Sequence, residues 1–124
     1  MKGEEVAKGD DIQERLVRLA VDIVLLCDQL PKRSSAAHIT EQLLCSGTSP
    51  APNYAEARGA ESDRDFIHKL GVVLKELNET GVWMQILIRT SMVPPGQVKP
   101  IQDECTSLCR IIAASIRTMK RREH

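Results

Sequence analysis

Apolar residues recur at steps of three and four along most of the chain, which is the spacing of one face of an α-helix. The first such run covers about residues 11 to 29 and stops before Pro31, because proline does not continue a helix. Asp11 with Glu14 three residues later resembles a capping box at its start. Residues 1–10 are polar, and we expect a flexible N-terminus there. The apolar positions of the run are Ile12, Leu16, Leu19, Ile23, Leu26 and Leu30.

Two further runs of the same spacing follow, separated by a segment of different composition. One begins at Ser34 or Ser35 and ends near Gly47. The other begins after the N-cap residue Ser62, with an aspartate in the capping-box position, and continues to about Thr90. Its apolar positions are Phe66, Leu70, Val73, Leu77, Met84 and Leu87.

The segment MVPPGQVKP, residues 92–100, interrupts the pattern before a fourth run over about residues 98 to 121. Pro100 fits this helix only in its first turn, where no backbone donor is needed. Three consecutive cations at the end of the run complement the negative end of the helix dipole. Four helices with short connections predict an all-α, antiparallel up-down-up-down four-helix bundle that forms a single domain over residues 11–122.

Two of these helices carry more apolar surface than one bundle needs. Val17, Val21, Val24 and Leu25 form a second apolar stripe on the first helix. The third helix is widened in the same way. The apolar face of each helix is therefore broader than a solvated helix of a monomeric bundle requires. The residues that widen the third helix are Ile67, Val72, Leu74, Ile86 and Ile88.

The composition argues against some fold classes and some kinds of partner. The 124 residues suffice for one core, and only one tyrosine, one phenylalanine and one tryptophan are present, which argues against an all-β fold. The formal net charge is zero, so no global positive field attracts nucleic acid or an anionic membrane. No stretch approaches the roughly 18 apolar residues that span a bilayer, so we expect a cytoplasmic protein whose four cysteines are reduced thiols.

Two carboxylate and histidine pairs have the spacing that di-iron sites use in helix bundles: His38 with Glu41, and Asp65 with His68. His68 lies two residues from the core position Phe66 and therefore faces away from the apolar stripe. Two ordinary surface histidines are the simpler interpretation.

The thiols Cys105 and Cys109 lie one turn apart on one helix face, but a zinc site would need two further ligands. Core thiols are the simpler interpretation.

The chain contains no glycine-rich phosphate loop, nucleophile elbow or HExxH motif. We therefore expect no metal, no cofactor and no catalytic residues, with a metal enzyme as the minority hypothesis.

The remaining candidate chemistry is electrostatic. Arg110, Arg117 and Arg121 recur at near-heptad steps along the fourth helix and are joined by Lys120. Cations at residues 32 and 33 lie at the opposite end of an antiparallel bundle, so one continuous patch is not expected. A solvated helix face is the simpler interpretation of these charges. In a ring of copies, however, each row would be repeated, and phosphate binding would gain from that multiplicity.

The most unusual segment is SGTSPAPNYAEARGAES, residues 46–62, and it is recognisable together with its flanks. The stretch QLLCSGTSPAPNYAEARGAESDRDFIHKLGVVLKELNETGVWMQIL, residues 42–87, resembles the central signature of the bacterial four-helix bundle protein family, which includes proteins encoded in intervening sequences of large-subunit ribosomal RNA genes. The signature residues are SGTS at 46–49, Asn53, Ala55, Glu56, FIHKL at 66–70 beginning with Phe66, Lys75, Glu76, Leu77, Glu79, Thr80 and Trp83.

The resemblance implies an antiparallel four-helix bundle that assembles into a ring-shaped homopentamer with no catalytic activity. It also implies kinship with the accessory protein of diversity-generating retroelements, which partners a reverse transcriptase and contacts nucleic acid through a basic surface. Family members that bind nucleic acid are strongly basic, whereas this chain is neutral, and that difference argues against direct RNA binding.

Pro50 and Pro52 are a second departure from the family, because each removes a backbone donor from the second helix. We predict a break near Ser49 and a restart after Pro52, with Asn53 capping the new turn. Asn53 and Glu56 are expected to make structural hydrogen bonds near the helix hairpin.

Glu76 lies in the middle of a mostly apolar helix, and we expect it to make a buried or inter-subunit polar contact. The sequence thus favours a non-enzymatic, homo-oligomeric helical scaffold or adaptor, with a pentamer implied by the resemblance. The alternative is a nucleic-acid-binding accessory protein, for example to a reverse transcriptase, that uses Arg110, Arg117, Lys120 and Arg121.

Overall fold

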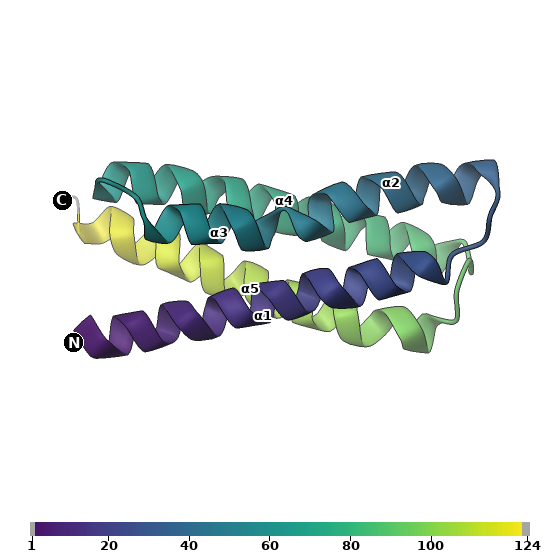
Figure 1. Cartoon of the computed structure of the whole chain (residues 1–124), viewed down its shortest axis with the longest axis horizontal. Helices are drawn as coiled ribbons and strands as arrows, with labels where there is room; N and C mark the ends of the chain where they lie inside the picture. The colour runs from purple at the N-terminus through teal and green to yellow at the C-terminus, as the bar shows by residue number, and fades with distance from the viewer. Residues whose placement is uncertain (1, 123–124) are drawn as a thin grey trace.

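The computed structural model describes the backbone of residues 2–122 and the side chains of residues 8–122, and over this range all regular secondary structure is helical. The helices run antiparallel, and α2 and α3 follow each other as one bent segment, so the chain makes the four legs of a bundle (Figure 1). The predicted all-α four-helix bundle is confirmed. The helices are α1 (Lys2–Asp28), α2 (Ser34–Thr48), α3 (Pro50–Arg58), α4 (Asp63–Arg89) and α5 (Pro95–Arg122).

The predicted start of the first helix is wrong. Helix α1 begins at Lys2, so Asp11 lies inside it and does not cap it. Residues 4–8, EEVAK, are mostly strong helix formers without proline, and nothing in them stops the helix. The flexibility expected of residues 1–10 stays a prediction.

The predicted break in the second helix is confirmed, and its details differ. Ser49 separates α2 from α3 but keeps helical backbone angles (φ −74°, ψ −38°), so the break is a bend. The second helix resumes at Pro50 and not after Pro52. Both prolines fall in the first turn of α3, where a missing N–H is tolerated because it has no partner inside that helix. Asn53 is therefore an internal residue and not the cap.

At the N-terminal ends of α4 and α5, the predicted cap of α4 is confirmed and the predicted start of α5 is wrong. Ser62 Oγ accepts the Asp65 N–H at 3.1 Å, as the sequence predicts. Helix α5 begins at Pro95, earlier than predicted, so Pro100 lies beyond the first turn. Proline at this position cannot donate to the carbonyl of Gly96. Gly96 is exposed at the end of the bundle, where water can satisfy that carbonyl.

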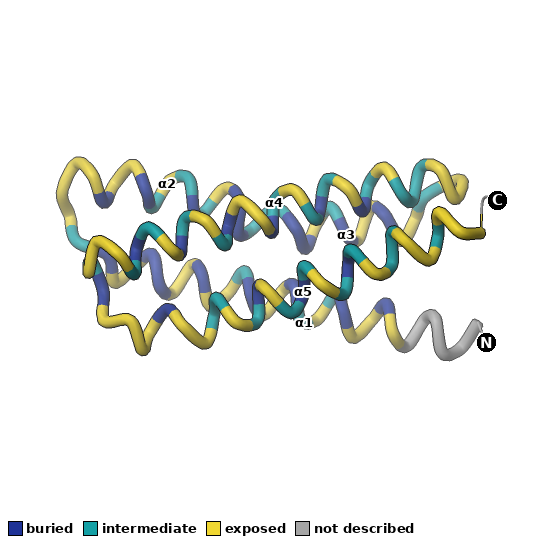
Figure 2. The backbone as a smooth tube through the Cα atoms, turned by 180° about the vertical axis from the view of Figure 1, so that it is seen from behind, coloured by how far each residue is buried: buried dark blue, intermediate teal, exposed yellow. Residues whose placement is uncertain are grey.

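The core runs the length of the bundle, and buried positions face inward on every helix (Figure 2). Helix α5 packs mainly on α4, and α1 packs mainly on α2. Helices α1 and α4 are not neighbours in the described range and occupy diagonal corners of the bundle. Side chains that are completely enclosed include Leu16, Ile23, Leu43, Leu70, Leu77, Met84, Leu108 and Ile112.

The extra apolar stripe on α1 faces solvent. Val17, Val21, Val24 and Leu25 are 41%, 50%, 40% and 55% exposed. The residues that widen α4 are instead half-buried, so most of that arc packs within the bundle. Val82 is the exception on α4 and is 54% exposed. The surplus of apolar surface thus lies mainly on α1.

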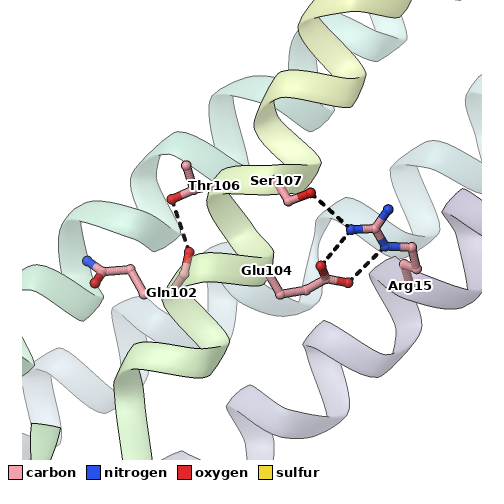
Figure 3. Close-up of polar contacts among 5 residues, drawn as sticks. All are labelled: Arg15, Gln102, Glu104, Thr106 and Ser107. Atoms are coloured by element: carbon pink, nitrogen blue, oxygen red, sulfur yellow. Dashed lines mark hydrogen bonds and ion pairs between the residues drawn. The ribbon is translucent and has the colours of Figure 1, made fainter. Parts of the chain in front are cut away.

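Helices α1 and α5 touch over a short length, and a polar clamp joins them there (Figure 3). Arg15 Nε donates to Glu104 Oε2 at 2.9 Å, and Arg15 Nη2 donates to Glu104 Oε1 at 2.6 Å. Arg15 Nη2 also donates to Ser107 Oγ at 3.1 Å. The charged side chains are 29% and 35% exposed, so water screens this pair less than a surface pair.

We expect this clamp to contribute measurably to stability. A double-mutant cycle with Arg15→Ala and Glu104→Ala should give a coupling energy of about 1 kcal/mol, the upper end for such pairs, because the contact is bidentate and partly buried. Urea unfolding at fixed protein concentration measures it. The matched control is the exposed pair of Glu14 and Arg18 within α1, for which about 0.3 kcal/mol is expected. Equal coupling in the two cycles would contradict the role assigned to the clamp.

Candidate functional site

The signature segment contains a close approach between α2 and α1. Gly47 is buried, and a Cβ at this position would lie 2.6 Å from Ile23 Cδ1 and 2.9 Å from Ile23 Cγ2. Its φ is not positive, so glycine is needed here for space and not for an unusual backbone conformation. The absence of a side chain therefore allows α2 to pack directly on α1.

The preceding residue fixes α2 against α4. Ser46 and Thr80 are both completely buried, and their hydroxyl oxygens lie 3.0 Å apart. Thr80 Oγ1 also donates to the Glu76 carbonyl at 2.8 Å. A hydrogen-bonded hydroxyl pair can be buried at little cost, whereas an unpaired hydroxyl cannot. This pair therefore aligns α2 with the middle of α4.

The rest of the SGTS segment hydrogen-bonds within its own chain segment. Thr48 Oγ1 donates to the Leu44 carbonyl one turn earlier. Asn53 Nδ2 donates to Ser49 Oγ at 2.7 Å and to the Ser49 carbonyl at 2.9 Å. Asn53 thus braces the bend between α2 and α3 from inside α3. Pro50 and Pro52 have no backbone N–H to donate there, so the asparagine adds hydrogen bonds where the backbone lacks donors.

The other signature residues are spread along the bundle. Phe66 is half-buried at the start of α4, and Trp83 lies further along the same helix. Trp83 Nε1 donates to Glu79 Oε2 at 3.3 Å, and its ring meets His38 of α2 edge-on, with ring centroids 6.0 Å apart. These aromatic rings therefore pack between helices and do not gather in one pocket.

The two signature glutamates have different surroundings. Glu56 is exposed on α3, and Glu76 is half-buried on α4. Within residues 8–122, neither carboxylate makes a hydrogen bond or an ion pair. The structural hydrogen bond expected of Glu56 is thus not seen within this range. The inter-subunit contact expected of Glu76 stays a prediction.

The predicted basic residues form a row on the outer face of α5. Arg110, Arg117, Lys120 and Arg121 are all exposed. None of them has an ion-pair partner among the side chains that the structure describes. The cations of residues 32 and 33 follow α1 at the opposite end of the bundle (Figure 1), so they do not join the row.

The thiols and histidines do not converge on a metal site. No group of three or more His, Cys, Asp or Glu side chains is arranged for a metal within residues 8–122. His38 and His68 are both exposed. The same range contains no helix with the length and apolar character of a membrane span.

The four thiols are free and differ in access. Cys45 is exposed and Cys109 is half-buried, whereas Cys27 and Cys105 are buried. Burial raises the pKa of Cys27 to about 11. A hydrogen bond with Cys109 and burial both raise the pKa of Cys105, which also donates to the Leu77 carbonyl at 3.2 Å. Cys105 is thus a core thiol, as predicted, whereas Cys109 was also predicted to be one and is only half-buried. The exposure of Cys45 was not foreseen.

The contacts at Ser46, Gly47 and Thr80 were missed by the sequence interpretation, which treated the segment only as a signature. The detectable signal is two adjacent small residues inside a helical apolar pattern, because small residues permit close helix packing. Arg15 and Glu104 carried no signal, since their contact joins residues far apart in the chain.

Comparison with known proteins agrees with this geometry. The family model described as "23S rRNA-intervening sequence protein" matches residues 10–114. A crystal structure of a protein of unknown function from the S23 ribosomal protein family of Bacteroides thetaiotaomicron VPI-5482 is 35% identical and superposes with a TM-score of 0.79. That match covers 85% of this chain and 97% of the other. No curated protein matches the sequence.

We expect Gly47→Ala to destabilise the protein by about 1–3 kcal/mol, because the new methyl group overpacks the contact with Ile23. The loss should appear as a lower urea midpoint at fixed protein concentration. The control Gly71→Ala adds a methyl group that meets nothing within 4 Å, so helix propensity should raise stability by up to about 1 kcal/mol.

A second substitution tests the stated cause. Ile23→Val removes Cδ1, the atom nearest to the added methyl group, so it should cost less in the Gly47→Ala background than in the native protein. Additive losses would show that the effect of Gly47→Ala does not arise at Ile23.

Proposed function

Because the chain belongs to the 23S rRNA-intervening sequence protein family, we propose that it is a non-enzymatic helical scaffold that acts as a homo-oligomer, with five copies in a ring. The observation that carries this proposal is the apolar stripe of Val17, Val21, Val24 and Leu25, whose residues remain 40–55% exposed in the bundle. A row of exposed branched residues on one helix face is typical of surfaces that bind another protein.

A ring requires two different surfaces on each copy, one for each neighbour. The outer faces of α1 and α4 meet this requirement, because the two helices lie at diagonal corners. Val82 supplies an exposed apolar residue on α4. The proposed contact therefore joins the α1 stripe of one copy to the outer face of α4 in the next.

Charges of both signs flank these two faces. Asp28 is exposed beside the α1 stripe, and Lys75 and Arg89 are exposed on the outer face of α4, so these charges can attract each other across the contact. Glu14 beside the stripe is already paired with Arg18, and Glu79 is exposed one turn before Val82. Helix periodicity places these charges on the same side as the apolar residues that they flank.

Light scattering coupled to size-exclusion chromatography tests the proposal. The expected mass at micromolar concentration is five times the chain mass of 13.8 kDa. Val21→Glu places a charge in the middle of the stripe and should reduce the mass to that of one chain, with helix content unchanged by circular dichroism. The control Ala55→Glu adds the same charge at an exposed position of α3 and should not change the mass.

Three results count against parts of the proposal. A native mass of 13.8 kDa would reject the oligomer. An oligomer with another number of copies would reject the pentamer. An oligomer that Val21→Glu leaves intact would show that the α1 stripe is not the contact.

A second function has support from the row of Arg110, Arg117, Lys120 and Arg121. These cations lack partners among residues 8–122, so each is available to a phosphate group. A ring would present several such rows and raise the affinity through multivalency. The protein would then be a nucleic-acid-binding accessory protein, for example to a reverse transcriptase.

Salt-dependent RNA binding tests this second function. The native protein should bind single-stranded RNA at low salt, and its affinity should fall steeply as salt rises. The triple variant Arg110→Gln, Arg117→Gln, Arg121→Gln should lower the slope of log affinity against log salt by roughly 2, since each lost phosphate contact accounts for about 0.7. The double variant Lys32→Gln, Arg33→Gln at the other end is the control. Absence of binding at low salt would eliminate this function.

A further inference from the structure

A cavity of about 700 Å³ lies at the end of the bundle that holds the start of α1 and the end of α5. The backbones of these two helices diverge toward this end (Figure 1). Helices α1, α3, α4 and α5 all contribute to its wall. Its volume lies within the range of about 300–1,000 Å³ that is usual for small-molecule sites.

The wall of the cavity is mostly apolar and includes an aromatic ring. Ile12 of α1, Phe66 of α4, and Ile111 and Met119 of α5 line it. Ile12 is almost completely buried, and the other three are half-buried because the cavity exposes part of each side chain. These side chains can cover an apolar molecule from three helices.

Tyr54 supplies a polar group that faces the open space of the cavity. Its residue is only 5% exposed, and its hydroxyl makes no hydrogen bond with any residue that the structure describes. Among the described residues no fully enclosed side-chain oxygen lacks a partner, so solvent in the cavity reaches this hydroxyl. Burial raises the pKa of Tyr54, so the hydroxyl is protonated at neutral pH and can donate a hydrogen bond.

The charged groups that residues 8–122 contribute to the wall are two cations and one anion. Lys8 and Arg122 are exposed, and neither has an ion-pair partner among residues 8–122. Asp63 is the acid in the wall. Two nearby carboxylates are already neutralised, since Asp10 pairs with Arg58 at 2.8 Å and Asp65 pairs with Lys69 at 3.1 Å. Among the side chains of residues 8–122, the mouth of the cavity thus has an excess of positive charge.

We propose that this cavity binds a small amphiphilic carboxylate. The apolar part of the ligand packs against Ile12, Phe66 and Ile111. The carboxylate accepts the hydrogen bond that Tyr54 can donate and is attracted by Lys8 and Arg122. The site is independent of the oligomer proposed above, because none of its wall residues belongs to the apolar stripe of α1.

Decanoate is the probe for this site, and isothermal titration calorimetry measures its binding to the full chain. Tyr54 is the only tyrosine, so its ring signals in NMR spectra report on the cavity without ambiguity. Saturable binding with a shift of these signals is expected. Decylammonium has the same apolar chain and the opposite charge, and it should bind at least tenfold more weakly.

Four variants test the placement. Tyr54→Phe should weaken decanoate binding roughly 3- to 10-fold, because the ligand loses one hydrogen bond. The double variant Lys8→Gln, Arg122→Gln should weaken it further. Ala114→Phe fills the cavity from its wall and should abolish binding. The control Arg117→Gln removes an exposed cation of the same helix outside the wall and should change the affinity less than twofold.

The proposal fails if decanoate does not bind saturably, if decylammonium binds equally well, or if Tyr54→Phe and Ala114→Phe both leave the affinity unchanged. Light scattering on Ala114→Phe gives a separate test. A change in oligomer mass without decanoate binding to the native protein would assign the cavity to a contact between copies and overturn the ligand proposal. Circular dichroism of each variant confirms that loss of binding does not result from loss of fold.

Discussion

The contact of Gly47 with Ile23 determines how closely α2 can approach α1, and the neighbouring Ser46 binds α4 through Thr80. Two consecutive residues thus position α2 against two different helices. A close helix contact needs space at one position, and a hydrogen bond needs a partner at that position. Burial of aliphatic surface, in contrast, is not directional. This one turn of α2 therefore fixes the position of α2 relative to both α1 and α4.

The seam between α1 and α5 is the loosest part of the same structure. The bidentate contact of Arg15 with Glu104 joins the two helices near the middle. On either side of it the seam opens, into the Tyr54 cavity at one end and into a space of about 450 Å³ beside Leu25 and Ile101 at the other. Helix α1 consequently takes part in both proposals, through its outer apolar stripe and through the cavity on its inner side.

The fold could be predicted from the sequence to a large extent because its elements are defined by local patterns. The 3.6-residue spacing identified every leg of the bundle, and Pro50 and Pro52 marked the bend. The errors lie at helix ends. An apparent capping box at Asp11 placed the start of α1 too late, because a cap signal does not end a helix when good helix formers precede it. Asn53 was interpreted as a cap and instead braces Ser49 from within α3.

The sequence by itself determined the helical class, the number of legs, the bend after α2 and the surplus of apolar residues on α1, because each depends on residues close together in the chain. Only the tertiary structure decided which residues meet across helices. The Ser46 and Thr80 pair, the clamp of Arg15 with Glu104 and the place of Tyr54 in the cavity wall belong to this second group. Helix periodicity defines which face of each helix is buried, but the axial position and angle of packing follow from side chains interlocking in three dimensions.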